Sequence, residues 1–219
     1  MISALVFDFD GVLVDSEPLH LRAYQEVLEP RGVSLPREEY YARYLGYDDS
    51  GVFTAVAHAR GLNLDAREVV ALSEEKTRLF DALLAAGDVN LYPAAAECVA
   101  RLAAVWPLGI ASGALRHEIE GTLRGRGLER YFRFIVAAGE TPASKPAPDP
   151  YARAAALHGV PPAECVAIED SRWGIEAAKA AGLWCIAITH TYPVPELMQA
   201  DAIITSLEEL TPELIRTLG

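Results

Sequence analysis

The chain has 219 residues, half of them hydrophobic, which is enough apolar sequence for a sizeable core. Its formal net charge of −12 argues against nucleic acid or an anionic membrane as a partner. No uncharged run reaches the roughly 18 residues of a membrane-spanning helix. Since no signal segment precedes the first predicted strand and no cysteines show Cys-x-x-Cys spacing, we expect a cytoplasmic protein.

The chain begins with a predicted strand and continues as helices. An apolar run over residues 4–7 predicts a buried strand, and Ser16 is placed to cap the helix that follows. We predict helices over residues 17–29, 36–44, 50–60 and 65–86. No strand pattern interrupts them, so residues 16–89 are predicted to form an all-helical domain.

Strand and helix patterns alternate from residue 90 onward. Predicted strands cover residues 107–111, 134–138, 165–168, 184–188 and 202–204, and predicted helices cover 93–105, 115–126, 149–158, 171–181 and 207–218. Such alternation is typical of a parallel sheet covered by helices on both faces. We therefore predict an α/β fold, a doubly wound parallel sheet built from residues 1–15 and 90–219, with the helical domain inserted after the first strand.

Two acids, Asp8 and Asp10, follow the first predicted strand. A buried strand that ends in two acids is costly unless a cation lies beside them. An EF-hand calcium loop starting at Asp8 is excluded, because its fifth and sixth positions hold Val12 and Leu13. Taken alone, the pair fits a structural cap as well as a metal site.

Polar residues also follow later strands or lie in nearby loops. They are Ser112 with Gly113, Lys145 within a proline-rich loop, and Glu169 with Asp170. Each has an ordinary structural interpretation: a turn, an exposed lysine and a helix N-cap, respectively. Because the carboxyl ends of parallel strands meet at one edge of a sheet, we expect these residues to converge there with the two N-terminal acids.

Together, these segments resemble the four motifs of the haloacid dehalogenase superfamily, in the same order. The stretch from Asp8 to Glu17 is most similar to the β-phosphoglucomutase and sugar-phosphatase group, and residues 170–182 extend the fourth motif. The resemblance covers essentially the whole chain. It implies a phosphoryl-transfer enzyme in which residues 16–89 form a cap domain over a small substrate.

The resemblance implies a Mg²⁺ site. Asp8 and Asp170 would each give a carboxylate oxygen, and Asp10 its backbone carbonyl. Glu169 would be a further ligand or a support for the others. Four acids that converge cannot all stay ionised without a cation, and oxygen ligands beside a phosphate suit Mg²⁺.

The resemblance also implies catalytic roles. Asp8 would be the nucleophile that forms an aspartyl-phosphate, with Asp10 as general acid and then general base. Lys145 would neutralise the phosphoryl group. Ser112 and Gly113 would donate hydrogen bonds to its oxygens.

In the helical domain, the resemblance implies that His20 and Lys76 contact the acid/base aspartate or the substrate, and that the turn containing Gly46 and Tyr47 contacts the substrate. The alternative interpretation makes His20 and Lys76 solvated helix positions, or pairs His20 with Glu17.

This turn departs from the mutase pattern. A mutase holds a second phosphate with an arginine after the turn glycine, but this chain has Asp48 and Asp49 there, and Leu115 in place of a later lysine. Arg43 or Arg116 could compensate, although neither matches a motif. We therefore expect hydrolysis of a small, sugar-like phosphate monoester.

Two alternatives remain open. One is a β-phosphoglucomutase-like enzyme, which would need a bisphosphate activator. The other is a non-catalytic binding protein on the same fold, although such a protein has no chemical reason to keep the acidic cluster. The sequence does not name the alcohol, and either a monomer or a homodimer is compatible with it.

Overall fold

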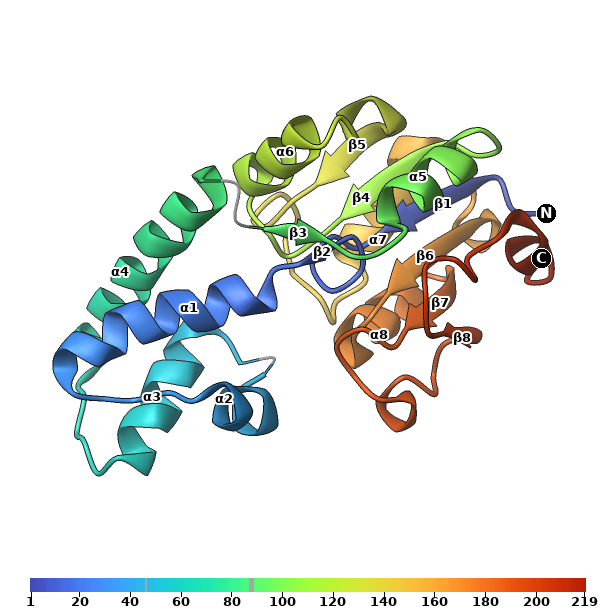
Figure 1. The fold of residues 1–219 in the computed structure, drawn as a ribbon. Coiled ribbons are helices and arrows are strands. Elements are labelled where there is room, and N and C mark those ends of the chain that lie inside the picture. The colour runs from blue at the N-terminus through green and yellow to red at the C-terminus, as the bar shows by residue number, and fades with distance from the viewer. Residues whose placement is uncertain (46, 87–88) are drawn as a thin grey trace. The chain divides into compact units, whose positions relative to one another are not determined.

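A parallel β-sheet and the helices packed on it form the larger part of the molecule. The computed structural model describes residues 1–45, 47–86 and 89–219. Six strands lie in the order β5-β4-β1-β6-β7-β8, all parallel (Figure 1). They are β1 (Ala4–Phe7), β4 (Leu108–Ala111), β5 (Phe132–Val136), β6 (Cys165–Glu169), β7 (Trp184–Ile188) and β8 (Ala202–Ile204). The predicted parallel α/β fold is confirmed.

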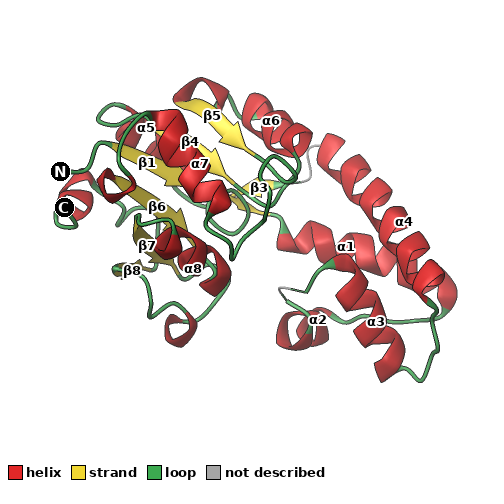
Figure 2. Cartoon of the chain, turned by 180° about the vertical axis from the view of Figure 1, so that it is seen from behind, coloured by secondary structure: helices red, strands yellow, loops and turns green. Residues whose placement is uncertain are grey.

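Helices cover both faces of this sheet. They are α5 (Ala95–Ala103), α6 (Arg116–Gly125), α7 (Asp149–His158), α8 (Arg172–Ala180) and α9 (Pro212–Arg216), with short 3₁₀ turns η2 (Glu129–Tyr131), η3 (Pro162–Glu164) and η4 (Val194–Glu196). Helices α7 and α8 pack on the strands from one side, and α5 lies on the other (Figures 1 and 2).

The alternation of side chains along β1 explains why the sheet is buried on both faces. Ala4 and Val6 belong to a core cluster that includes Tyr151 of α7. Leu5 and Phe7 point the other way because successive strand residues alternate, and both are also fully buried. A strand buried on both faces needs an uninterrupted apolar run, as the sequence has here.

The chain divides into two compact units, and the sequence predicts a division at the same residues. One unit is Met1–Asp15 with Asn90–Gly219, and the other is Ser16–Val89. The second contains α1 (Glu17–Leu28), η1 (Glu29–Arg31), α2 (Arg37–Arg43), α3 (Asp49–Ala59) and α4 (Ala66–Ala85). Its own apolar core includes Tyr24, Tyr40 and Phe53.

The C-terminal helix is shorter than predicted. The sequence pattern favours a helix over 207–218, but α9 spans only Pro212–Arg216. Pro212 cannot donate a backbone hydrogen bond and fits the first turn of a helix, not its interior. Thr211 therefore becomes the N-cap, and its hydroxyl accepts from the amide of Leu214.

Two further local expectations need correction. Ser16 precedes α1 as expected, but its backbone is already helical and its hydroxyl makes no capping hydrogen bond. The short antiparallel pair β2 (Val14–Asp15) and β3 (Asn90–Leu91) was not predicted. Two residues are too few to show a periodic pattern.

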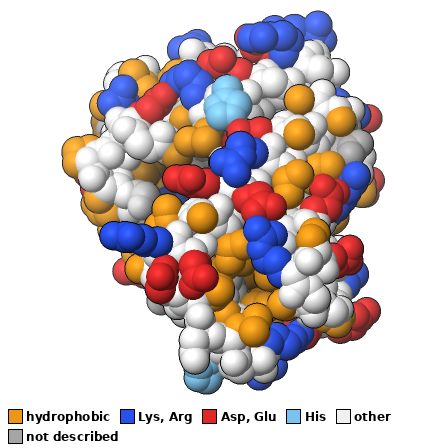
Figure 3. Space-filling model, turned by 90° about the vertical axis from the view of Figure 1, so that its left-hand side faces the viewer, with side chains coloured by type: hydrophobic (Ala, Val, Ile, Leu, Met, Phe, Trp, Pro, Cys, Tyr) orange, Lys and Arg blue, Asp and Glu red, His pale blue; other side chains and the backbone are white. Residues whose placement is uncertain are grey.

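Charged side chains are mixed on the surface. On the face shown in Figure 3, basic side chains lie among acidic ones. Within residues 1–45, 47–86 and 89–219, no helix combines the length and apolar content needed to cross a membrane.

Candidate active site

Three neighbouring strands bring predicted motif residues to one edge of the sheet. Asp8 follows β1, Ser112 follows β4, and Glu169 ends β6. Because β4, β1 and β6 are adjacent and parallel, their carboxyl ends share that edge (Figure 1). This is the position at which open α/β sheets bind ligands.

Asp8, Glu169 and Asp170 form a buried cluster of carboxylates. Their relative exposures are 8%, 0% and 5%. One carboxylate oxygen from each lies within 4.8 Å of the other two. Three acids this close repel one another when ionised, so the cluster needs compensating positive charge.

Lys145 supplies part of that charge. Its Nζ lies 2.9 Å from Asp8 Oδ1 and 2.6 Å from Glu169 Oε1. Burial acts to lower the pKa of Lys145, but the charges of Asp8 and Glu169 outweigh it, and the pKa lies above its ordinary value. The lysine is therefore a fixed cation between two acids.

One ammonium group does not balance the cluster. Burial, together with the charge of Glu169 and against the charge of Lys145, raises the pKa of Asp8 to about 7. Burial and the neighbouring carboxylates raise the pKa of Asp170 well above its ordinary value. A divalent cation with oxygen ligands would favour the ionised carboxylates and so lower both pKa values. The residues present therefore fit the predicted Mg²⁺.

A tight turn after β1 carries Asp10. In it, the amide of Gly11 donates to Val14 O over 2.9 Å. Gly11 has φ +75°, and a Cβ there would overlap the carboxylate of Asp170, so only glycine fits. The imidazole Nδ1 of His190 lies 2.9 Å from Gly11 O, a contact that sequence reasoning missed.

Ser112 and Gly113 lie in the loop after β4. The Ser112 side chain is 5% exposed, and its Oγ accepts a hydrogen bond from the amide of Ala114. The hydroxyl proton therefore remains a donor for another group. Nothing lies within 4 Å of a Cβ built on Gly113, so no steric contact requires glycine at this position.

In the helical unit, the buried Lys76 contacts the partly buried His20. Lys76 Nζ lies 2.8 Å from His20 Nδ1 and 2.9 Å from Asp49 Oδ1. Tyr24 donates to the same Asp49 oxygen over 2.6 Å, and His20 stacks on Phe80 at 4.2 Å. Burial, followed by the charge of Lys76, lowers the pKa of His20 to about 3. The imidazole is thus neutral, and Nδ1 accepts from the lysine.

This geometry corrects the solvated interpretation of Lys76 and gives His20 a partner other than Glu17. Lys76 is 3% exposed, so it is not a solvated helix position. Glu17 accepts from Tyr40 over 2.8 Å, while His20 pairs with Lys76.

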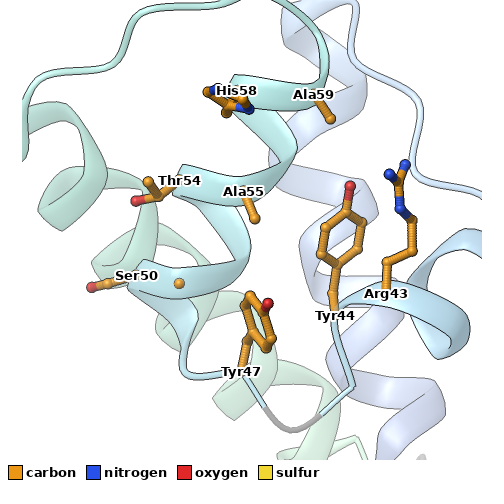
Figure 4. Close-up of a pocket in the computed structure, with 9 residues that line it drawn as sticks. Arg43, Tyr44, Tyr47, Ser50, Thr54, Ala55, His58 and Ala59 are labelled. Carbon is orange, nitrogen blue, oxygen red and sulfur yellow. The ribbon is translucent and has the colours of Figure 1, made fainter.

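Tyr47 lines an open hollow on α3, whereas Gly46 lies outside the described residues. The hollow has a volume of about 690 Å³. Figure 4 shows Tyr44 opposite Ala55 and Tyr47 at the lower end of α3, and their rings lie edge to face with centres 6.4 Å apart. The other lining residues are Arg43, Ser50, Gly51, Thr54, Ala55, His58 and Ala59.

The two arginines considered as ligands for a second phosphate are both engaged in ion pairs. Arg116 lies 2.6 Å from Glu140, and Arg43 lies 3.9 Å from Glu39 in the same helix.

Sequence reasoning also missed Tyr151. Its hydroxyl donates to Glu169 Oε1 over 2.7 Å, and its ring lies beneath Lys145 Nζ, 4.9 Å from the ring centre. The only sequence signal was an apolar position on a predicted helix, which gives no indication of a polar contact.

Comparison with known proteins supports one family. The family model described as haloacid dehalogenase-like hydrolase matches residues 2–182. Hexitol phosphatase B of Escherichia coli is 34% identical over 213 residues, 96% of this chain and 95% of that protein. Fructose-1-phosphate phosphatase YqaB of Escherichia coli is 33% identical over 181 residues, 83% of this chain and 93% of that protein.

A solved structure agrees. A variant of CbbY from Rhodobacter sphaeroides, in complex with xylulose-(1,5)bisphosphate, superposes with a TM-score of 0.79 at 32% identity over 96% of each chain. These similarities confirm the resemblance and the predicted enzyme class, a phosphoric monoester hydrolase. With its motif residues gathered at the edge of a parallel sheet and its match to the family model, the chain belongs to the haloacid dehalogenase-like hydrolases.

Proposed function

We propose that this enzyme hydrolyses a small, sugar-like phosphate monoester with Mg²⁺, through an aspartyl-phosphate on Asp8. The observation that carries the proposal is the ion pair between Asp8 and Lys145, at the strand edge shared with Ser112 and the other acids. A buried carboxylate beside a fixed cation is placed to act as a nucleophile toward an anionic phosphate.

In the first half-reaction, a carboxylate oxygen of Asp8 attacks phosphorus in line with the leaving oxygen. The P–O bond to the alcohol breaks, and Asp10 gives a proton to the departing oxygen. Lys145 offsets charge on the phosphoryl oxygens, and the Ser112 hydroxyl donates to one of them.

In the second half-reaction, Asp10 takes a proton from water, and the water oxygen attacks the aspartyl-phosphate. The bond between phosphorus and Asp8 breaks, which releases inorganic phosphate and restores both acids. Mg²⁺ would be held by Asp8, Asp170 and the Asp10 carbonyl, and would supply further positive charge to the phosphoryl group.

The helical unit, residues 16–89, is proposed to be the cap that selects the alcohol. His20, Lys76 and Tyr47 are its candidate contacts. The charge of Lys76 is already paired with Asp49, which favours a neutral group over a second phosphate at that point.

Names of relatives support the same substrate class. Two are named as phosphatases of fructose 1-phosphate and of hexitol phosphates, while the CbbY complex holds a sugar bisphosphate. The substrate panel should therefore contain sugar and polyol monophosphates together with bisphosphates.

Phosphate release across this panel, with and without Mg²⁺, tests the proposal. We expect Mg²⁺-dependent release that Asp8→Asn lowers by at least about 10³-fold. The matched control is Asp65→Asn, which makes the same substitution at the N-cap of α4 in the helical unit. Asparagine caps a helix as well as aspartate does.

Substantial release by the Asp8→Asn variant would refute Asp8 as the nucleophile. If no ester is hydrolysed but a sugar monophosphate is isomerised when a bisphosphate primer is added, the enzyme is a mutase.

A further inference from the structure

The Glu169 carboxylate is held by several donors and is 0% exposed. Its Oε1 accepts from Lys145 Nζ at 2.6 Å and from the Tyr151 hydroxyl at 2.7 Å. Its Oε2 accepts from the Ser171 hydroxyl at 3.1 Å and from the amides of Asp170 and Ser171 at 3.1 and 3.2 Å. A carboxylate offers about four lone-pair positions, so these donors occupy them all.

Helix α8 leaves this carboxylate little room to move. A Cβ built on Gly174 would overlap the Glu169 carboxyl group, so the helix backbone lies directly against it. The Ser171 hydroxyl accepts from the amide of Gly174, which directs its proton toward Glu169. Turning Glu169 toward a metal ion would therefore break donor contacts on both of its oxygens.

Tyr151 contacts both members of the pair formed by Glu169 and Lys145. It is fully buried on α7 within the apolar core beneath the sheet. Its hydroxyl reaches Glu169, while its ring faces the ammonium of Lys145 at 4.9 Å. A rigid ring on a packed helix fixes these atoms more closely than a loop side chain would.

We propose that Tyr151 is a positioning residue that holds Glu169 as the fixed counter-ion of Lys145, so that Glu169 orients the lysine and does not coordinate metal. The proposal rests on the proposed function, in which Lys145 contacts the phosphoryl group. Two of the three Lys145 protons point to Asp8 and Glu169, which leaves the third for a phosphate oxygen.

The test begins with Tyr151→Phe, which keeps the ring and removes only the hydroxyl. We expect kcat for p-nitrophenyl phosphate to fall about tenfold, and inhibition by inorganic phosphate to weaken similarly. The Mg²⁺ dissociation constant of the metal-free protein, measured by calorimetry, should stay within about twofold. Ala155→Gly on the same buried side of α7 is the matched control: it lowers the melting temperature but should leave kcat and phosphate inhibition unchanged.

Metal titration of Glu169→Gln and Asp170→Asn decides the role of Glu169. We expect Asp170→Asn to weaken Mg²⁺ binding by more than about 100-fold, and Glu169→Gln by less than about tenfold. Glu169→Gln should instead weaken the binding of inorganic phosphate, measured by calorimetry as the metal binding is. Equal loss of Mg²⁺ binding in the two variants would overturn the proposal, as would a Tyr151→Phe enzyme with unchanged kcat and phosphate inhibition. These titrations need no substrate, so failure of the wild-type enzyme to hydrolyse any sugar phosphate would count against the proposed function alone.

Discussion

At the scale of single residues, two glycines define the space around the acids. A side chain at Gly11 would occupy the place of the Asp170 carboxylate, and one at Gly174 the place of Glu169. In both cases the glycine allows backbone to approach a charged group closely. The absence of a side chain at each glycine thus leaves the space that the carboxylate occupies.

Gly11→Ala should reduce both activity and Mg²⁺ binding. It combines a strained positive φ, worth about 1–2 kcal/mol, with overlap on Asp170. Gly127 has a similar φ of +68° with nothing within 4 Å of a built Cβ. In Gly127→Ala, the positive φ should therefore lower the free energy of unfolding, measured in urea, by a similar amount, about 1–2 kcal/mol. Its kcat should stay at the wild-type value. Equal activity in both variants would show that Asp170 tolerates the overlap.

The histidine in the helical unit gives a pH prediction. The pKa of His20 is lowered to about 3 by burial and by Lys76, whereas an unfolded histidine titrates near 6.5. Between these values the unfolded state binds the extra proton, so this stabilising contribution is present above pH 6.5 and is lost as pH falls. The slope is at most about 1.4 kcal/mol per pH unit.

Urea unfolding between pH 5 and 7.5 measures this slope. His20→Gln should flatten it, while His58→Gln, at an exposed position of α3, should leave it unchanged. An unchanged slope in His20→Gln would mean that other groups dominate.

At the scale of secondary structure elements, one cluster ties three helices together. Tyr24 and His20 come from α1, Asp49 begins α3, and Lys76 lies in α4. The contacts of Lys76 Nζ join all three. From the sequence, Asp49 is an acid in the turn where a mutase would hold a second phosphate. In the structure its carboxylate is the counter-ion of a buried lysine.

Loss of Asp49 and loss of Lys76 should lower the unfolding free energy by different amounts. Asp49→Ala leaves Lys76, whose side chain is 4% exposed, without its carboxylate, and should cost about 3 kcal/mol of unfolding free energy. Lys76→Met should cost about 1 kcal/mol, because the Asp49 side chain is 28% exposed and keeps Tyr24 and water as partners.

Glu26→Ala is the control for this comparison, since it breaks the exposed ion pair with Arg22 on α1 and should cost much less. Chemical unfolding of the three variants ranks them. A cost for Lys76→Met that equals or exceeds that of Asp49→Ala would contradict the assignment.

At the scale of the whole molecule, two units each have their own apolar core, and the acidic cluster lies within the sheet unit. Uncompensated acids destabilise a fold, so any cation that binds them adds stability. The surplus of acids over bases, 31 against 19, does not prevent phosphate binding when positive charge is supplied at the site.

Mg²⁺ should therefore raise the melting temperature. At a concentration 100 times the dissociation constant, the gain is about 2.7 kcal/mol, or about 5–10 °C for a chain of this size. Asp170→Asn should remove most of this shift, whereas K⁺ at equal ionic strength controls for screening. No shift in the wild-type protein would argue against a metal site at this edge.

The sequence by itself determined the order of the elements and the positions of the motif residues. The apolar run before Asp8, the alternation of patterns after residue 90 and the helical periodicity of 16–89 are local signals, because each depends on side-chain spacing within one element. The start of the last helix was harder to predict: Pro212 was included in the interior of a longer predicted helix, although proline fits only a first turn.

Only the tertiary structure decided which side chains meet. Tyr151 and Glu169 are 18 residues apart, and His20 and Lys76 are 56 apart, so no pattern within one element could pair them. The same holds for Gly11 and Asp170, where part of the reason for glycine is a side chain that follows a different strand, β6. Such contacts follow from how the strands and helices pack, and packing depends on the whole fold.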